Sequence, residues 1–333
     1  MEIDLSAIAS SEKFRTWLGV SSNQDINFKL LGHGEYNLNY RFTHPISGDE
    51  LVLRIPMGSQ MHLDNQVRYE YQALLQLMPS GRTPKPLYID DTKADFEYGF
   101  LVMDFLSGRS LVYETDLPFA AACLADIHNL EAPAGSHLIS PKNPLSAILD
   151  ECHAMFKHFN DSELASPEIK DMISSLLVFG QNIIDRSVCI DERCIINTEL
   201  NSGNFLVNDD GATYLIDWEK PLLGSPGQDL GHFLAPTTTL WKTDTLLSAD
   251  DIRHFLEIYC RSSKRFDDVL MLHDTTMPYL RMNCLRGVTW CAMAWVEYQQ
   301  PDRLLRDDFT FEKIKFYITP EFLEKLRKDY LCV

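Results

Sequence analysis

Short apolar runs separated by turn-forming residues occupy the first third of the chain, and they predict β-strands. The runs are residues 28–31, 40–43, 51–55, 86–89 and 98–105. Two helices are predicted within the same region, because apolar side chains recur at helical spacing over residues 6–18 and 65–78. This third of the chain therefore has the pattern of a small sheet accompanied by few helices.

From residue 116 onward the apolar positions recur mainly every three or four residues, which predicts helices. The predicted helices are residues 119–130, 145–159, 168–184, 249–259, 278–298 and 320–331. The last one is well signalled, since Thr319 can cap it and Pro320 suits its first position. A strand-rich third followed by a helical remainder is an α+β order, and it argues against an alternating Rossmann fold.

One strand-rich island, near residues 205–217, interrupts the helices, and it has the pattern of a hairpin around the turn-rich residues 208–211. Asn204 precedes its first strand and Asp217 follows its second, so the two residues should face each other at the open end. An amide oxygen and a carboxylate placed there can hold Mg²⁺; the alternative is an ordinary polar turn. Glu199, five positions before Asn204, can direct its carboxylate at whatever the metal orients.

Four residues of the strand-rich third have the chemistry of a phosphate site. Gly32 and Gly34 lie between two predicted strands, where a glycine loop brings backbone N–H groups close to phosphate. Hairpin loops often contain glycine, so this signal is weak alone. Arg54 lies on the next strand and Glu70 in the following helix, and such a pair can hold the cation against phosphates. An ordinary ion pair between sheet and helix would have the same pattern.

Taken in order, these segments resemble the aminoglycoside phosphotransferase and choline kinase family. The similar segments are the phosphate-loop hairpin (34–42), the third strand (51–56), the paired helix acid (Glu70), the lobe hinge (100–108), a helix motif (124–130), the catalytic loop (197–204), the metal-binding segment (216–219) and the turn after it (224–231). The resemblance spans residues 29–234, and several motifs in one order rarely arise by chance.

The resemblance implies an α+β, protein-kinase-like fold of two lobes. Residues 1–103 would form a nucleotide-binding lobe with a small antiparallel sheet and one main helix. Residues 104–333 would form a larger, mostly helical lobe that carries the catalytic and substrate-binding residues. The cofactors implied are ATP and Mg²⁺.

The resemblance also assigns roles in the nucleotide site. Gly34 and its neighbours, Gly32 among them, would cover the phosphates. Arg54 would contact the phosphates and Glu70 would hold Arg54. Backbone atoms around Met103 to Phe105 would meet adenine.

In the catalytic loop and metal segment, the resemblance makes Asn204 and Asp217 the Mg²⁺ ligands. Asp229 is expected to brace the loop, and His128 to have a structural role. Lys220 either supplies a further cation near the transferred group or is a surface lysine.

The chain departs from the family in the catalytic loop, where Glu199 follows Asn197 and Thr198 in place of His-Gly-Asp. Glutamate keeps the carboxylate that orients the acceptor hydroxyl, but it adds a methylene that displaces the oxygens. One interpretation is a small-molecule kinase that uses Glu199. The alternatives are a nucleotide-binding pseudokinase that acts as a regulatory or binding partner, or a transferase that moves another group such as AMP. Arg54 also replaces the more common lysine, and it keeps the charge.

The predicted acceptor site lies among the C-terminal helices, at Trp241, Asp244, Trp290 and Glu297. Aromatic rings with a carboxylate suit an ammonium group, although Trp290 and the nearby Trp295 could equally be core residues. The substrate expected is a small hydroxylated molecule such as an amine or amino sugar.

The composition disfavours some classes of binding partner but does not identify one. The 333 residues contain 30 Lys+Arg and 48 Asp+Glu, a formal net charge of −18, which disfavours binding to nucleic acid or anionic membranes. Eight scattered cysteines without a C-x-x-C pair predict neither a zinc site nor a disulfide framework. We expect no signal peptide, and a cytoplasmic location fits these features. The oligomeric state stays open.

Overall fold

Residue contacts divide the chain into two units in the computed structural model, which describes residues 3–21, 23–33, 36–187, 192–300 and 308–331. Unit 1 contains residues 1–110, 130–139 and 204–221, and unit 2 contains residues 111–129, 140–203 and 222–333. Both units are therefore built from separated stretches of chain. The lobe boundary after residue 103 stays a prediction.

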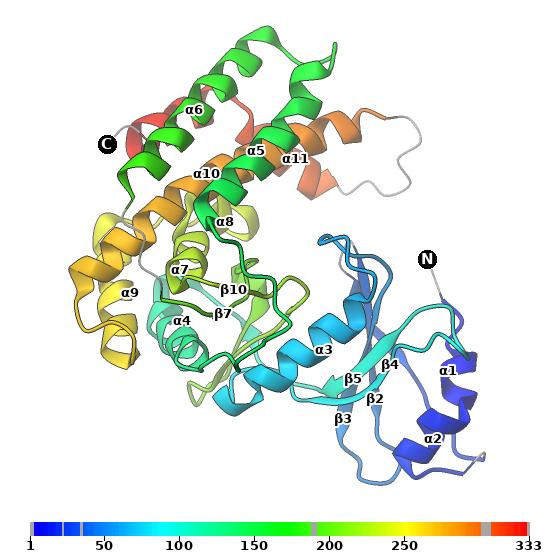
Figure 1. The fold of residues 1–333 in the computed structure, drawn as a ribbon. Helices are drawn as coiled ribbons and strands as arrows, with labels where there is room; N and C mark the ends of the chain where they lie inside the picture. The colour runs from blue at the N-terminus through cyan, green and yellow to red at the C-terminus, as the bar shows by residue number, and fades with distance from the viewer. Residues whose placement is uncertain (1–2, 22, 34–35, 188–191, 301–307, 332–333) are drawn as a thin grey trace. The chain divides into compact units, whose positions relative to one another are not determined.

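An antiparallel sheet of five strands forms the centre of unit 1, in the order β1-β2-β3-β5-β4 (Figure 1). The strands are β1 (Lys29–His33), β2 (Asn37–Thr43), β3 (Glu50–Pro56), β4 (Pro86–Asp90) and β5 (Phe100–Asp104). All four strand pairs are antiparallel, with β3 between β2 and β5. The predicted strands of the first third are thus present.

Helices cover both faces of this sheet (Figure 1). They are α1 (Ser6–Ser10), α2 (Glu12–Leu18) and α3 (Gln66–Leu77), the last followed by the 3₁₀ turn η1 (Met78–Ser80). Leu53 and Ile55 of β3 belong to one core cluster with Ile8 and Phe14 of α1 and α2. Successive side chains of a strand point to opposite faces, so Arg54 points to the face that α3 covers.

A smaller antiparallel sheet completes unit 1 and contains the predicted hairpin. Its strands are β6 (Arg109–Ser110), β8 (Phe205–Val207) and β9 (Thr213–Leu215), with the 3₁₀ turn η2 (Ser202–Asn204) just before β8. Phe205 pairs with Leu215, and the Ile216 N–H donates to the Asn204 carbonyl oxygen at 2.9 Å. Asn204 and Asp217 therefore lie at the same open end of the hairpin, as the turn pattern predicts.

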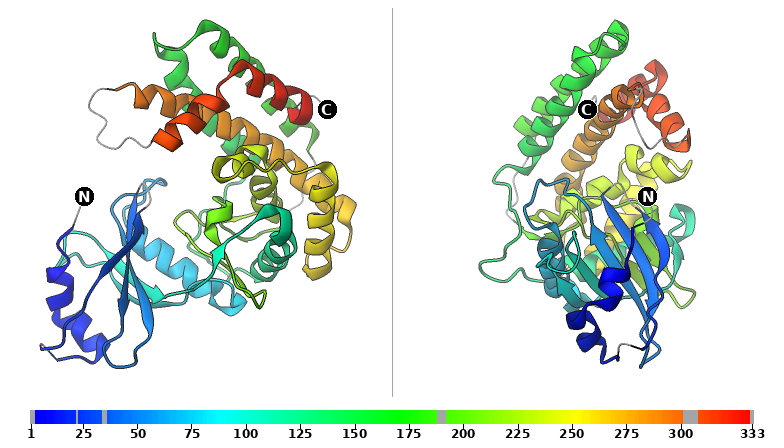
Figure 2. Two further views of the ribbon diagram at one scale, coloured as in Figure 1. Left: turned by 180° about the vertical axis from the view of Figure 1, so that it is seen from behind. Right: turned by 90° about the vertical axis from the view of Figure 1, so that its right-hand side faces the viewer.

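Unit 2 is mostly helical, and α10 packs against six other α-helices of this unit, among them α5 and α6 (Figure 2). Its elements are α4 (Tyr113–His128), α5 (Pro144–Asp161), α6 (Pro167–Arg186), β7 (Cys194–Ile196), β10 (Leu222–Gly224), α7 (Pro226–Leu234), α8 (Pro236–Lys242), α9 (Ala249–Ser262), α10 (Val269–Tyr298), α11 (Asp308–Tyr317), α12 (Pro320–Leu326) and the π-helical turn η3 (Arg327–Leu331). No helix in the described ranges is both long and apolar enough to cross a bilayer.

Helix boundaries are where the sequence predictions were wrong. The first predicted helix is two helices, because Ser11 has an extended ψ of 124° between them. The helix predicted to begin at Pro278 begins at Val269, where the Asp268 side chain accepts the Leu270 N–H at 2.8 Å. Pro278 therefore lies inside α10 rather than at its start, because tertiary packing overrides the local preference of proline for a first turn.

The structure describes six of the eight cysteines. Six are buried free thiols, including Cys284 and Cys291 in α10. Cys189 and Cys332 lie outside the described residues. Burial raises the pKa of the Cys152 thiol to about 12, so this thiol is inert near neutral pH.

Candidate functional site

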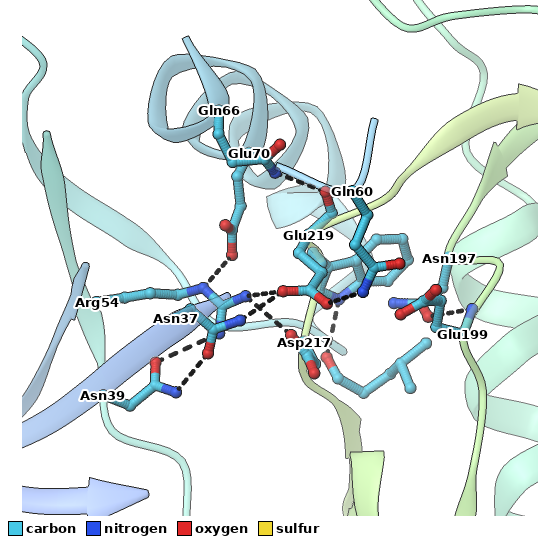
Figure 3. Close-up of polar contacts among 12 residues, drawn as sticks. Asn37, Asn39, Arg54, Gln60, Gln66, Glu70, Asn197, Glu199, Asp217 and Glu219 are labelled. Atoms are coloured by element: carbon cyan, nitrogen blue, oxygen red, sulfur yellow. Dashed lines mark hydrogen bonds and ion pairs between the residues drawn. The ribbon is translucent and has the colours of Figure 1, made fainter. Parts of the chain in front are cut away.

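Arg54 is the centre of a charged cluster within unit 1 (Figure 3). Its side chain is 4% exposed, and its Nε lies 2.7 Å from Oε1 of Glu70, which is 2% exposed. The strand cation and helix carboxylate that the sequence pairs are thus in contact. Burying either partner alone would be costly, so each residue requires the other to remain charged.

Two further carboxylates reach the same guanidinium. Nη2 of Arg54 lies 2.8 Å from Oδ1 of Asp217 and 3.4 Å from Oε2 of Glu219 (Figure 3). Burial would lower the pKa of Arg54, but Glu70, Asp217 and Glu219 outweigh it and raise this pKa. Burial also raises the pKa of Glu70, although Arg54 acts against this shift. Three carboxylates thus contact one guanidinium, and their oxygens give this cluster the chemistry of a cation site.

Asp217 is held in an uncommon backbone conformation at the end of the hairpin. Its φ is +63°, in the left-handed region that residues other than glycine seldom adopt. The neighbouring Trp218 is 1% exposed, and its indole N–H donates to the Leu215 carbonyl oxygen at 3.0 Å. This buried indole anchors the segment, so the left-handed turn directs Asp217 towards Arg54.

Glu219 joins the segment to β2 and α3, and sequence reasoning assigned it no role. Its Oε2 accepts a hydrogen bond from the Asn37 amide, and its Oε1 accepts one from Gln60 at 3.1 Å. Its backbone oxygen accepts a further bond from the Gln66 amide at 2.6 Å (Figure 3). A second acid two positions after Asp217 was the available signal, but its amide partners are distant in sequence.

The donors in this cluster suit Mg²⁺. Asp217 and Glu219 supply carboxylate oxygens, which are the hard ligands this ion prefers. Asn204, whose amide oxygen is a ligand of the same kind, lies at the same end of the hairpin as Asp217. The described residues contain no group of three His, Cys, Asp or Glu arranged as a metal site. Mg²⁺ usually takes only one or two carboxylates and completes its coordination with substrate phosphates and water. The residues therefore fit a metal that is held jointly with a bound nucleotide.

The predicted catalytic loop belongs to unit 2 up to residue 203, and Asp229 of α7 holds the start of the loop. The two carboxylate oxygens of Asp229 accept the N–H groups of Asn197 and Thr198, both at 2.7 Å. His128, which is fully buried, lies with its Nε2 3.2 Å from Asp229 and its Nδ1 3.0 Å from the Tyr259 hydroxyl. These contacts are the bracing expected of Asp229 and the structural role expected of His128.

Backbone strain coincides with the residues predicted to carry the chemistry. Four described residues other than glycine have a positive φ, and two of them are Thr198 and Asp217. Thr198 has a φ of +72°, which is unfavourable for a β-branched side chain. It directly precedes Glu199, whose N–H donates to Oδ1 of Asn197 at 3.1 Å. Strained backbone of this kind concentrates at functional sites.

The predicted phosphate loop is described only in part. Gly34 lies outside the described residues. Gly32 lies within β1, opposite Asn39, and not in the loop as predicted. An added Cβ at Gly32 would meet no atom within 4 Å, so packing does not require glycine there.

The predicted adenine-binding segment ends β5. Met103 pairs with Val52 in the sheet. The N–H of Asp104 donates to the backbone carbonyl oxygen of Lys85 at 3.1 Å, and the N–H of Phe105 donates to that of Glu50 at 3.0 Å. These two N–H groups are therefore engaged within unit 1.

Two of the predicted acceptor residues lie together in unit 2. The rings of Trp241 and Trp290 are 5.4 Å apart and nearly perpendicular, and both side chains are half-buried. Asp244 is exposed, with Oδ1 3.4 Å from Nζ of Lys313, and Glu297 is also exposed. Trp295 instead packs against Phe159, with ring centres 5.8 Å apart, which is a core contact.

Comparisons with known proteins agree with this fold. The family model of the phosphotransferase enzyme family matches residues 27–263, more than half of the chain. A Ralstonia eutropha protein assigned to the aminoglycoside phosphotransferases is similar in structure, with 14% identity, a TM-score of 0.70 and 98% and 99% of the two chains covered. No curated protein matches the sequence.

Two further structures have the same fold. A choline kinase from Streptococcus pneumoniae is 18% identical, with a TM-score of 0.61 and 94% and 97% of the chains covered. A spectinomycin phosphotransferase bound to ADP and spectinomycin is 14% identical, with a TM-score of 0.62 and 92% and 93% covered. The fold is thus protein-kinase-like, of the kind found in small-molecule phosphotransferases. The chain belongs to the phosphotransferase enzyme family.

Proposed function

We propose that this protein is an ATP- and Mg²⁺-dependent phosphotransferase that moves the γ-phosphate to a hydroxyl group of a small molecule. In this proposal Arg54 contacts the phosphates, Glu70 holds Arg54, and Asn204 and Asp217 bind Mg²⁺. The metal would neutralise charge on the phosphates. The similar spectinomycin phosphotransferase was solved with ADP, which supports the use of an adenine nucleotide here.

The observation that carries the proposal is the surplus of carboxylate around Arg54. Glu70, Asp217 and Glu219 all lie within 3.4 Å of this single guanidinium. A purely structural ion pair needs one acid, whereas here two further carboxylates, those of Glu219 at 15% and Asp217 at 36% exposure, also contact the guanidinium. A magnesium nucleotide supplies a cation for these carboxylates, and Arg54 meets the phosphates that come with it.

Glu199 is the proposed proton acceptor. The acceptor oxygen forms a bond to the γ-phosphorus, the bond from this phosphorus to the ADP oxygen breaks, and the hydroxyl proton passes to the Glu199 carboxylate. Phosphoryl transfer depends mainly on positioning and charge neutralisation, so a longer carboxylate in place of aspartate is compatible with turnover.

The proposed acceptor residues are Trp241, Asp244, Trp290 and Glu297. The paired, half-buried rings of Trp241 and Trp290 and the two exposed carboxylates suit a cationic acceptor, such as an amine or amino sugar. Alanine substitution of each residue, with KM measured for an acceptor once one is found, tests this assignment. An unchanged KM in all four variants would refute it.

The first experiment is a thermal shift with ATP, with and without Mg²⁺, on the wild type and Asp217→Asn. Asparagine tolerates the left-handed conformation of residue 217, so this variant loses the charge without added strain. A ligand that binds only the folded state stabilises it by about 2.7 kcal/mol when the ligand concentration is about 100 times Kd. We expect a rise in Tm that requires both Mg²⁺ and Asp217.

The matched control is Asp209→Asn, which makes the same change at an exposed turn residue of the same hairpin. This variant should keep the full Mg²⁺-dependent shift. No shift of the wild type under any condition would overturn the proposed function. A shift that survives in Asp217→Asn would overturn the assignment of the metal ligand.

A second function is favoured by one observation, the glutamate at position 199 where the family has aspartate. If this change abolishes turnover, the protein is a nucleotide-binding partner whose bound state regulates another molecule. Stoichiometric, Mg²⁺-dependent ATP binding without phosphate transfer to any acceptor in a broad screen would favour this alternative. Transfer that is lost in Glu199→Gln would exclude it.

A further inference from the structure

A second arginine, Arg286 in the middle of α10, lies between two carboxylates of unit 2. Its Nε is 3.1 Å from Oε2 of Glu151 on α5, and its Nη2 is 3.3 Å from Oε1 of the same residue. The same Nη2 lies 3.7 Å from Oε1 of Glu199. Neither the family resemblance nor the motif spacing pointed to Arg286 or Glu151.

The contacts on the two sides of Arg286 differ in kind. The two-point contact with Glu151 fixes the plane and direction of the guanidinium, as the forked geometry of arginine allows. The distance of 3.7 Å to Glu199 is too long for a hydrogen bond. Arg286 therefore attracts the Glu199 carboxylate without forming a hydrogen bond to it.

The backbone of Glu199 is fixed independently of Arg286. The N–H of Glu199 donates to Asn197, and Asp229 holds the N–H groups of Asn197 and Thr198. The main chain is thus held from α7, while the end of the side chain is drawn towards α10. A glutamate side chain has one more rotatable bond than aspartate, so it needs this second constraint more than aspartate would.

Arg286 is a cation that faces Glu199 within unit 2. The titratable groups facing the loop from the helices packed around it are Arg286, Glu151, Cys152, Asp229 and His232. Burial acts to lower the pKa of Arg286. The carboxylates of Glu151 and Glu199 outweigh this effect and raise the pKa, so the guanidinium stays charged. Burial raises the pKa of Cys152 to about 12, so this thiol is neutral.

We propose that Arg286, clamped by Glu151, is a positioning residue for Glu199, and that it holds the carboxylate of this longer side chain where it accepts the proton of the acceptor hydroxyl. The catalytic part of this inference rests on the proposed function. The electrostatic coupling between Arg286 and Glu199 does not, and it can be measured without turnover.

The first test is a ¹³C NMR titration of the glutamate carboxyl carbons, with the Glu199 signal assigned from its loss in Glu199→Gln. Replacing Arg286 by Met removes the cation and leaves Glu151 beside Glu199, so the pKa of Glu199 should rise by about 1 unit or more. Replacing Glu151 by Gln removes the competing anion and should lower the same pKa. General loosening of the fold would move both variants in the same direction.

Arg281→Met is the matched control, because Arg281 lies on the same helix and its Nε is buried with no hydrogen-bond partner in the described structure. This variant should leave the pKa of Glu199 unchanged. An unchanged pKa of Glu199 in both Arg286→Met and Glu151→Gln would overturn the proposal. If Arg286→Met does not fold, the downward shift in Glu151→Gln decides alone.

The second test is kinetic and uses a double-mutant cycle. Arg286→Met should lower kcat about tenfold or more and move the acidic limb of the rate profile to higher pH, with the acceptor KM unchanged. In a Glu199→Gln background the same substitution should have no further effect. An equal loss of kcat in both backgrounds, or a rise in KM alone, would show that Arg286 acts on the substrate or the fold and would overturn the proposal.

The two tests also separate this inference from the proposed function. In one outcome, the titration shows that Arg286 and Glu199 are coupled, but the protein turns over no acceptor. This outcome would refute both the proposed function and the catalytic role of Arg286, and would leave only the ion pair. Turnover that requires Glu199 but shows neither coupling nor a shifted pH profile would refute the role of Arg286 and leave the proposed function intact.

Discussion

Each unit contains an arginine that is held by a glutamate, but the two clusters differ in burial and in charge. Arg54 in unit 1 is 4% exposed and contacts three carboxylates, whereas Arg286 in unit 2 is 20% exposed and contacts two. In both clusters one glutamate holds the guanidinium, namely Glu70 for Arg54 and Glu151 for Arg286. The difference lies in how much negative charge remains.

This difference indicates what each cluster can bind. Around Arg54 three carboxylates face one guanidinium, and they range from the buried Glu70 to Asp217, which is 36% exposed. Carboxylate oxygens of this kind are suited to a divalent cation. Around Arg286 the surplus is one charge, carried by the partly exposed Glu199, and this is suited to a single proton. The first cluster thus has the charge of a metal–nucleotide site and the second that of a proton acceptor.

The largest expected effect comes from removing the buried cation of unit 1. Arg54→Met leaves Glu70 charged at 2% exposure, so the free energy of unfolding should fall by about 3–5 kcal/mol in a urea titration. Arg286→Met should cost clearly less, because Glu151 and Glu199 are 39% and 25% exposed and water screens them. Equal losses in the two variants would contradict the contrast in burial.

Glu199→Gln should lower kcat by about 10²–10⁴-fold, because it removes the proton acceptor. The Mg²⁺-dependent thermal shift with ATP should persist, since the metal and nucleotide residues are in the other unit. Asp217→Asn should instead lose both the catalytic activity and the Mg²⁺-dependent thermal shift. A Glu199→Gln variant that loses ATP binding would show that the two functions are not separable in this way.

Glu219→Gln tests whether the third carboxylate around Arg54 contributes to Mg²⁺ binding. The variant removes one of three carboxylates, so the apparent affinity for Mg²⁺ should fall about tenfold in a thermal-shift titration with saturating ATP. Stability without ligand should hold or rise slightly, because repulsion among the acids is relieved. Asp209→Asn provides the control, and a Glu219→Gln protein with unchanged Mg²⁺ affinity would remove Glu219 from the metal site.

The smallest expected effect concerns the strained backbone. Thr198→Gly should raise the free energy of unfolding by about 1 kcal/mol by relieving the positive φ, while kcat falls because Glu199 is less well held. Lys93→Gly relieves backbone strain of the same kind at an exposed position with a φ of +54°, and it should raise stability without changing kcat. A stabilised Thr198→Gly variant with full activity would separate the strain from function.

Much of the site was predictable because its residues are carried by local patterns. Arg54 and Glu70 are a strand cation and a helix acid, and Asn204 and Asp217 flank a hairpin whose turn residues are explicit. In each case a strand or turn determines which side chains share an edge. Glu219, Gln60 and Arg286 could not be found in this way, because their partners come from elements distant in the sequence.

The sequence alone determined the α+β order and the hairpin, since periodicity and turn residues act over a few neighbouring positions. The family and the residues of the proposed chemistry came from the resemblance of motifs in one order. Tertiary structure decided the start of α10 at Val269, the placement of Gly32 within β1, and the partners of both arginines. The physical reason is that a buried charge is stabilised by whichever opposite charge the packing brings near it. That choice depends on how distant elements meet, and no local pattern contains it.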